Sequence, residues 1–248
     1  MPLETAKTAG MAMDGGLEAK LQAATNEDTT GLPEYLVRNY WWAYLTPTSL
    51  HLFDNWLFLT CLLWGNLPRL VRAACVEFRP GQSVLQAANA YGSIATELAR
   101  TVGADGRLDL VDVAPLQVEH VNRKLAPFPH ARARVADATR PGGAIYDGVC
   151  CFFLLHEIPD DEKRAVVDAL LARVGPGGKV VFIDYHRAQW WHPLRAPMSL
   201  VFRWLEPFAN SLIGSEIKAF ASGPGAFGWS KETFFGGLYQ KVVAVRRG

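Results

Sequence analysis

The stretch from Val84 to Gly92 limits the possible folds of this chain more than any other. It connects an apolar run predicted to be a strand over 82–87 to residues 92–102, which have the apolar spacing of a helix. A second strand is predicted at 107–113, with Asp112 at its end. Strand, tight loop, helix, strand and acid in this order form the arrangement that binds an adenosyl cofactor. We therefore expect a nucleotide-binding domain from this point onward.

The same alternation of strands and helices continues downstream. The further predicted elements are a helix at 115–125, a strand at 131–136, a strand at 147–153, a helix at 160–174, a strand at 179–184 and a hairpin over 233–245. Continuous apolar strands separated by amphipathic helices imply a parallel sheet covered on both faces. The expected fold class is α/β and Rossmann-like, with a mostly parallel seven-stranded sheet that ends in an antiparallel C-terminal hairpin.

The first 76 residues have a different character. Residues 1–31 lack a long apolar core and carry several acids, so a disordered tail is expected rather than a signal sequence. Residues 32–76 are rich in aromatic side chains and are expected to form a helical cap, with helices at 33–45 and 48–75. This cap either packs on the main domain or also enters a membrane interface, where Trp and Tyr are favoured.

The α/β domain is expected to span residues 77–248. Within it, residues 188–226 break the alternation with three tryptophans and four prolines, and are expected to form a lid. The formal net charge is only +1, which gives no general attraction to nucleic acid. No run of about 18 apolar residues is present, so no membrane-spanning helix is expected.

Ligands in such folds lie beyond the carboxyl ends of the strands. Asp112 is placed to accept hydrogen bonds from the ribose hydroxyls, and Asp137 with the small Ala138 to hold the adenine edge; either acid could instead be a solvated loop residue. The residues predicted to bind the cofactor are Gln86, Ala88, Tyr91, Gly92, Asp112, Val113, Asp137, Ala138 and Phe153.

Reactive side chains cluster at the ends of the fourth and fifth strands. The predicted catalytic residues are His156, Glu157, Asp184, Tyr185 and His186. A set of carboxylates and imidazoles can hold a divalent metal as a Lewis acid or act directly as acid and base. Two alternatives remain open: Asp184 and His186 could form a pair that anchors the lid, and His156 could be a buried core histidine.

Two motifs point to a known superfamily. The ordered set Asp112, Asp137, Tyr146-Asp147 and 174–178 resembles the class I S-adenosylmethionine-dependent methyltransferases over about 80–186. Residues 152–160 resemble the fourth-strand segment of the quinone-ring C-methyltransferases. The resemblance implies the class I methyltransferase fold and S-adenosylmethionine as the cofactor.

The first loop departs from the pattern of that superfamily. An acid is usual at position 86 and glycines at 88 and 90, whereas this chain has Gln86, Ala88 and Ala90 and keeps only Gly92. An alanine Cβ narrows the space for a ligand and disfavours a positive φ. The cofactor is therefore expected to be held in an unusual way, with Tyr91 either facing the sulfonium or packing on the first helix.

Flanking motifs at 40–45, 63–66, 184–187 and 191–195 resemble a narrower family, the rhodoquinone-biosynthesis methyltransferase-like proteins, from about Leu36 onward. This resemblance implies conversion of ubiquinone to rhodoquinone. In that reaction a ring methoxy group is replaced by an amino group, with S-adenosylmethionine as the amino donor and Mn²⁺ assisting.

The narrower resemblance also implies ligands and a location. The metal ligands would be His156, Glu157, Asp184 and His186, and the substrate contacts Tyr40, Trp41, Tyr44 and Trp191. The partners would be ubiquinone and rhodoquinone, with the protein at the cytoplasmic side of the inner membrane or the equivalent mitochondrial face. Two alternatives are a conventional quinone-ring C- or O-methyltransferase and a non-catalytic subunit that binds quinone or lipid.

Overall fold

A seven-stranded sheet forms the centre of the computed structural model, which describes residues 33, 36, 56–204, 206 and 208–248. The strand order is β3-β2-β1-β4-β5-β7-β6. The strands are β1 (Ser83–Ala87), β2 (Arg107–Asp112), β3 (Ala131–Val135), β4 (Tyr146–Phe152), β5 (Val174–Tyr185), β6 (Phe227–Phe234) and β7 (Tyr239–Arg246). β1 to β5 pair in parallel, and β7 runs antiparallel to both β5 and β6. The predicted fold class is confirmed.

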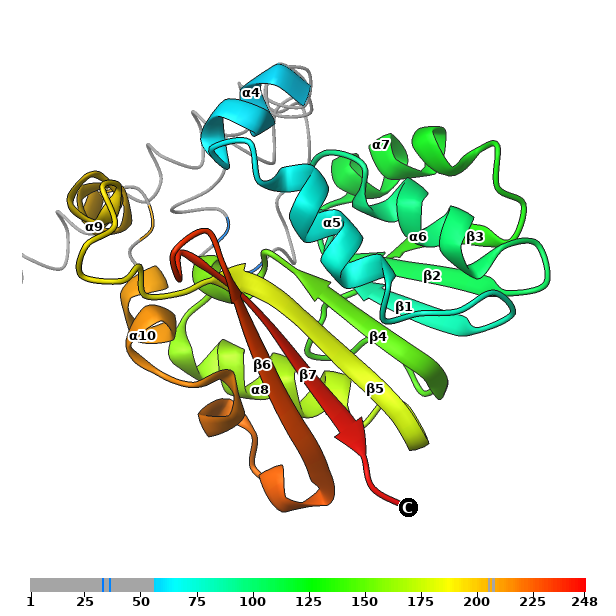
Figure 1. Ribbon diagram of the computed structural model, residues 1–248. Coiled ribbons are helices and arrows are strands. Elements are labelled where there is room, and N and C mark those ends of the chain that lie inside the picture. Colours follow the sequence, from blue (N-terminus) through cyan, green and yellow to red (C-terminus); the bar gives the residue numbers. More distant parts are fainter. Residues whose placement is uncertain (1–32, 34–35, 37–55, 205, 207) are drawn as a thin grey trace, which may run out of the picture.

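Helices cover both faces of this sheet (Figure 1). They are α4 (Trp56–Leu62), α5 (Leu67–Cys75), α6 (Ile94–Val102), α7 (Pro115–Leu125), α8 (Asp160–Leu171), α9 (Arg195–Trp204) and α10 (Ala209–Gly214), with short 3-10 turns η2 (Leu155–Glu157), η3 (Ile217–Phe220) and η4 (Pro224–Ala226). Apolar side chains of α5, α6 and α7 pack in one core with one face of the strands. α8 packs with the other face in a second core. None of the helices in the described part of the chain is long and apolar enough to cross a membrane.

The single helix predicted over 48–75 is wrong within the described residues. α4 ends at Leu62 and α5 begins at Leu67, because Trp64 and Gly65 both adopt a positive φ, of 51° and 75°. Asn66 stabilises the break, since its side-chain amide donates hydrogen bonds to the Leu63 and Trp64 carbonyls. The predicted tail, 1–31, and the predicted helix at 33–45 lie outside the described residues apart from Pro33 and Leu36.

β5 begins earlier than predicted. Residues 175–178 were expected to be a turn between a helix and a strand, but they lie within β5, and α8 ends at Leu171. The register shifts between the pairs Tyr146–Val174 and Gly148–Lys179, so β5 accommodates its additional residues in a bulge.

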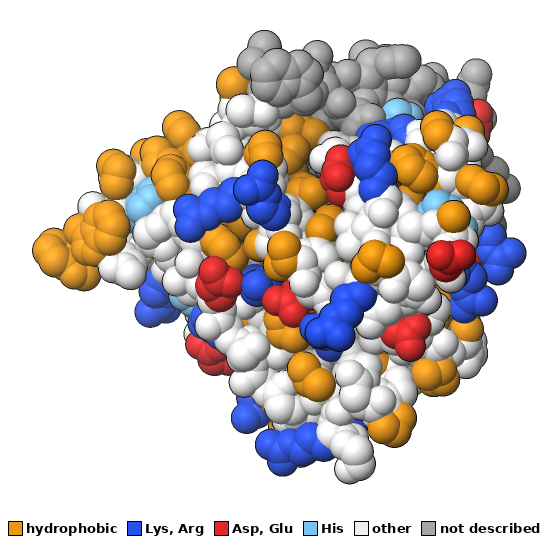
Figure 2. Space-filling model, turned by 45° about the vertical axis from the view of Figure 1, so that its right-hand side comes forward, with side chains coloured by type: hydrophobic (Ala, Val, Ile, Leu, Met, Phe, Trp, Pro, Cys, Tyr) orange, Lys and Arg blue, Asp and Glu red, His pale blue; other side chains and the backbone are white. Residues whose placement is uncertain are grey.

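Residues 188–226 connect β5 to β6 and contain α9, α10, η3 and η4. Two contacts attach the second half of this segment to α8. The fully buried Lys163 donates hydrogen bonds to the Phe208 carbonyl and the Ser211 hydroxyl, both at 2.8 Å. The Asp168 carboxylate accepts hydrogen bonds from the backbone N–H and the hydroxyl of Ser222. The first half projects from the molecule, and hydrophobic side chains gather on a projection at the left of Figure 2, on the side where α9 lies in Figure 1.

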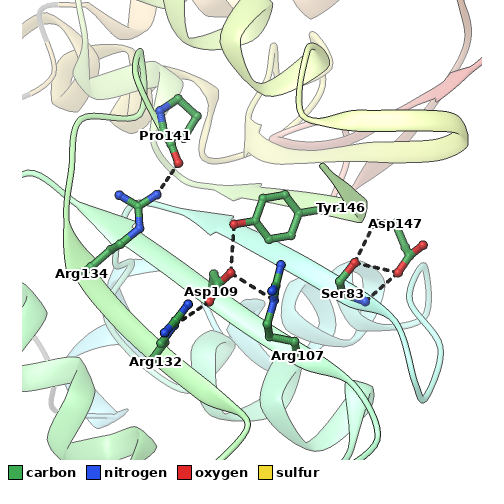
Figure 3. Close-up of polar contacts among 8 residues, drawn as sticks. All are labelled: Ser83, Arg107, Asp109, Arg132, Arg134, Pro141, Tyr146 and Asp147. Atoms are coloured by element: carbon green, nitrogen blue, oxygen red, sulfur yellow. Dashed lines mark hydrogen bonds and ion pairs between the residues drawn. The ribbon is translucent and has the colours of Figure 1, made fainter. Parts of the chain in front are cut away.

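No helix follows β3, since residues 136–145 form turns and loops. Polar contacts occupy the adjoining part of the sheet face instead (Figure 3). The Asp109 carboxylate accepts a hydrogen bond from the Tyr146 hydroxyl at 2.9 Å and pairs with Arg107 at 3.2 Å and Arg132 at 3.0 Å. These contacts join β2, β3 and β4 away from the carboxyl ends of the strands.

Candidate functional site

A cavity lies at the carboxyl ends of β1 to β5, where ligands bind in open α/β sheets. Side chains of α4, α5 and α9 cover it, among them Leu59, Leu67 and Val201. The predicted site residues that line the cavity are Ala88, Tyr91, Asp112, Val113, Asp137, Ala138, Phe153, His156, Glu157 and Tyr185. The predicted residues Gln86, Gly92, Asp184, His186 and Trp191 do not line it. Tyr40, Trp41 and Tyr44 lie outside the described residues.

The loop after β1 contains a non-glycine residue in the left-handed region. Ala88 has φ of 63°, and its backbone N–H donates to the Val111 carbonyl on β2 at 2.8 Å. A left-handed conformation costs an L-residue roughly 1–2 kcal/mol because its Cβ approaches the following carbonyl oxygen. The chain therefore keeps the glycine-like path of the loop although alanine occupies the position.

Replacing Ala88 with glycine is expected to raise the free energy of unfolding by up to about 1 kcal/mol, because it removes this strain. The measurement is urea denaturation followed by circular dichroism. Ala90→Gly is the matched control, since Ala90 does not adopt a positive φ and the same change there should cost about 0.5–1 kcal/mol. Equal effects at both positions would show that the path of the loop stores no strain at Ala88.

A buried side-chain network supports the same loop. The Asn89 amide donates to the Gln117 side-chain oxygen at 3.0 Å, and the Gln117 amide donates to the Tyr91 hydroxyl at 2.8 Å. Gln117 comes from α7 and is fully buried. Neither Asn89 nor Gln117 was among the predicted site residues, because nothing in their spacing shows that α7 would direct a polar side chain under the first loop.

Gln86 and Gly92 lie at the two ends of the loop. The Gln86 amide donates to the Ala88 carbonyl at 3.1 Å, while its buried side-chain oxygen has no hydrogen-bond partner among the described residues. Gly92 has φ of 95°, and a Cβ there would come within 3.1 Å of Leu67 and 3.2 Å of Leu59. Gly92 thus allows α4 and α5 to pack directly on the loop.

Asp112 lines the cavity at the end of β2. Its two carboxylate oxygens accept hydrogen bonds from the backbone N–H groups of Asn89, at 2.7 Å, and Ala114, at 2.8 Å. Burial nevertheless raises the pKa of the Asp112 carboxyl to about 6. A carboxylate has further lone pairs, so Asp112 remains able to accept hydrogen bonds from the vicinal hydroxyls of a ribose.

Asp137 and Ala138 line the cavity beyond β3, next to Asp112 in the order of the strands. One Asp137 oxygen accepts a hydrogen bond from the Thr139 N–H at 2.7 Å, which fixes the turn. Glu162 at the start of α8 also lines this part of the cavity. Burial raises the pKa of the Glu162 carboxyl, and the nearby Asp137 adds to the effect.

His156 and Asp184 form a buried pair beside the cavity. The His156 Nδ1 lies 2.8 Å from one Asp184 oxygen, so Nδ1 carries the proton and Nε2 is left for other partners. Asp184 is held in turn by the backbone N–H groups of Leu155 and Tyr185. Burial alone would lower the pKa of the His156 imidazole, but the Asp184 carboxylate raises it to about 9. At neutral pH the His156 ring is therefore protonated.

Carboxylates and aromatic rings surround the His156 side chain. Its Nε2 lies 3.6 Å from a Glu157 oxygen, and Glu206 also lines the cavity and helps to raise the pKa of His156. The Phe153 and Tyr185 rings stand edge-on to the imidazole, at centroid distances of 5.8 Å and 4.8 Å. Glu206 was not among the predicted residues, because it follows α9 in a segment without strand or helix periodicity.

His186 is not brought to this cluster. Its Nδ1 bonds the Gly237 carbonyl at 2.8 Å, and it lines a second, more polar cavity with Arg187 and Arg195. Within the described residues, no three His, Cys, Asp or Glu side chains converge in a way that could hold a metal ion. The Asp184 oxygens are already occupied by His156 and two backbone N–H groups. The predicted set of four manganese ligands therefore does not fit this geometry.

Comparison with known proteins finds similarities over the part of the chain that contains the first four strands. Residues 84–178, which contain β1 to β4 and the loops just described, match the family described as a methyltransferase domain. The matched segment is less than half of the chain, and over it the chain is similar to the class I S-adenosylmethionine-dependent methyltransferases. It is 29% identical over 117 residues to a demethylmenaquinone methyltransferase from Desulfitobacterium hafniense (strain Y51), and the match covers 44% of each protein.

Solved methyltransferase structures share the fold. An O-methyltransferase family protein from Burkholderia thailandensis superposes with a TM-score of 0.58 at 15% identity, over 83% of this chain and 75% of that one. The N-methyltransferase NodS from Bradyrhizobium japonicum superposes with a TM-score of 0.52 at 14% identity, over 73% and 94%. The match to a methyltransferase domain implies S-adenosylmethionine as the cofactor. The individual roles of the site residues remain predictions.

Proposed function

We propose that this protein transfers a group from S-adenosylmethionine to the ring of a membrane quinone. The observation that carries the proposal is one continuous cavity, in which the cofactor loops after β1 and β2 lead to the His156 side chain and to apolar and aromatic walls. A flat, lipid-soluble ring suits such walls, and a single charged group at its carbonyl oxygen would orient it.

Methyl transfer to a ring carbon is the reaction that the comparisons favour, since the curated relative is named a demethylmenaquinone methyltransferase. In this reaction the S–CH₃ bond breaks, a C–C bond forms, and the ring carbon loses its proton. The reduced ring must lose a hydroxyl proton to become nucleophilic. The His156 Nε2 would take that proton in its neutral form, and Asp184 would stabilise the imidazolium that results.

Conversion of ubiquinone to rhodoquinone is the second candidate, and two observations favour it. The Asp184 carboxylate raises the pKa of His156 to about 9, so the imidazolium is present at neutral pH and can donate a hydrogen bond to a quinone carbonyl. Such polarisation assists the amino nitrogen of S-adenosylmethionine in adding to the ring and displacing the methoxy group, which leaves as methanol. The bond between this nitrogen and the α-carbon must then break with loss of a proton from the β-carbon, so that the ring keeps an amino group and the rest of the donor leaves as an alkene. In addition, Gln86 and Ala88 differ from the residues usual in methyl-transferring relatives.

One experiment separates these candidates. The purified protein is incubated with ubiquinone or demethylmenaquinone, oxidised or reduced, and with S-adenosylmethionine labelled in either the methyl carbon or the amino nitrogen. Mass spectrometry of the quinone should show methyl label in the ring for the first candidate. Amino label together with loss of a methoxy group supports the second. If no quinone product forms with any acceptor, while S-adenosylmethionine still binds, the protein is a binding subunit and the proposal is wrong.

A further inference from the structure

The segment between β5 and α9 exposes large hydrophobic side chains to solvent. Trp190 is 82% exposed and Trp191 55%, and Leu200 on the outer face of α9 is 59% exposed. The Trp191 indole N–H bonds the Gln189 side chain at 2.7 Å, which fixes the ring on the surface. α9 lies on the side of the molecule where hydrophobic side chains form the projection in Figure 2. The exposure of more than half of each of two adjacent tryptophans is unfavourable in water and indicates a partner.

The charge of the same segment is entirely positive. Residues 186–205 include Arg187, Arg195 and Arg203 but no Asp or Glu. Arg187 and Arg195 are exposed, and neither guanidinium pairs with a carboxylate of the described residues. Both arginines line the second cavity together with His186 and Trp190.

An anionic group suits this second cavity. Its single acid, Glu216, pairs with Lys231 at 2.8 Å and is therefore already neutralised. Two arginines beside an open cavity offer the forked N–H donors that bind phosphate oxygens. The neighbouring tryptophans match the headgroup region of a bilayer, where an indole is apolar on its ring and polar at its N–H.

We propose that residues 187–203 form a docking surface for a bilayer that contains anionic phospholipids. Trp190, Trp191 and Leu200 enter the headgroup region, and Arg187 and Arg195 bind lipid phosphates. The opposite face of α9 reaches the first cavity, where Val201 lines the wall. The Phe202 ring packs on the Tyr185 ring, with 5.0 Å between the two ring centroids. Docking on this surface therefore brings the wall of the site next to the lipid. The docking surface does not depend on which group the enzyme transfers.

Vesicle co-sedimentation of the full chain tests the proposal, without quinone and without S-adenosylmethionine. Because the assay omits both, failure of docking and failure of the proposed reaction are distinguishable. The protein is expected to sediment with phosphatidylcholine vesicles that contain phosphatidylglycerol, and less with phosphatidylcholine alone. Trp190→Ala combined with Trp191→Ala should lower the partition coefficient roughly tenfold or more, since two interfacial anchors are lost.

The two arginines are expected to affect both the binding to anionic vesicles and its dependence on salt. Each of Arg187→Gln and Arg195→Gln should lower binding to anionic vesicles by about fivefold and reduce its dependence on salt. Ile145→Ala and Arg79→Gln, which remove exposed side chains at the opposite ends of the strands, are the matched controls and should bind as the unchanged protein does. Circular dichroism confirms that each variant is folded.

Two results would overturn the docking surface. The first is an unchanged protein that stays in the supernatant with anionic vesicles. The second is that the folded tryptophan and arginine variants sediment like the controls, in which case this surface binds a partner other than a bilayer.

Discussion

Replacing His156 with glutamine is expected to lower kcat for quinone modification by roughly 10²–10⁴-fold, the usual contribution of a positioned acid or base. Glutamine retains a hydrogen-bonding group of similar reach, but it cannot accept or release a proton at Nε2. The KM for S-adenosylmethionine should change little, because the loops proposed to hold the adenosyl group lie after β1 and β2 rather than at His156. Steady-state measurement of labelled quinone gives both constants.

Asp184→Asn is the companion variant. The Asp184 carboxylate is what raises the pKa of His156, so in this variant the imidazole should lose its proton at a lower pH. If the imidazolium is the active form, activity of the unchanged protein falls as the pH rises through about 9, and in Asp184→Asn it falls earlier. If neutral His156 is the active base, activity rises over the same range. An identical pH profile in both proteins would remove the pair from the mechanism.

Replacing Asp112 with asparagine is expected to weaken binding of S-adenosylmethionine by roughly 100-fold, because a hydrogen bond to a charged group contributes about 1.5–3 kcal/mol. In the unchanged protein the Asp112 carboxylate accepts hydrogen bonds from the backbone N–H groups of Asn89 and Ala114. The asparagine amide would point its own N–H donors at one of these two N–H groups, and that hydrogen bond would be lost. Isothermal titration calorimetry measures the dissociation constant, and no turnover is required.

Asp147→Asn is the control for this variant, since Asp147 contacts Ser83 at the other end of the sheet and should leave the affinity unchanged. The pH dependence gives a second check. Burial raises the pKa of Asp112 to about 6, so the unchanged protein should bind S-adenosylmethionine more weakly as the pH falls below about 6. If Asp112→Asn binds S-adenosylmethionine as tightly as the unchanged protein does, the ribose is held elsewhere.

The positions of the first four strands along the chain and the acids at the ends of the second and third were predictable from sequence. Each apolar run of five to seven residues before Asn89, Val113 and Phe153 became a buried parallel strand, because only such strands bury apolar side chains on both faces. The break at Trp64 was missed, since a tryptophan with positive φ has no sequence signature and only the following Gly65 suggests one.

The candidate site was less predictable than the fold. Strand alternation places Asp184 and His186 on one face and Tyr185 on the other. In the structure Asp184 and Tyr185 both contact His156, because η2 places the imidazole at the end of the strands. His186 instead forms a hydrogen bond with the Gly237 carbonyl, away from this cluster. Which residues meet at a strand end depends on turns that carry no periodicity. The hydrogen bond between Gln117 and Tyr91 could not be predicted either. Gln117 lies on α7, and the spacing of apolar residues in α7 shows only that one side of the helix is buried.

The attachment of residues 208–222 to α8 has a consequence for how a bulky ring reaches the cavity. Lys163 is fully buried, and its ammonium group donates hydrogen bonds to Asp160, Phe208 and Ser211. Separating it from Phe208 and Ser211 would remove two of these three hydrogen bonds from a buried charge, which is costly. Any movement that preserves those bonds, and that between Asp168 and Ser222, leaves the second half of the segment in place. The segment between β5 and β6 is thus attached to α8 through its second half. We therefore expect a ring to enter the cavity past α9, in the half of the segment that lacks these hydrogen bonds to α8, rather than past α10.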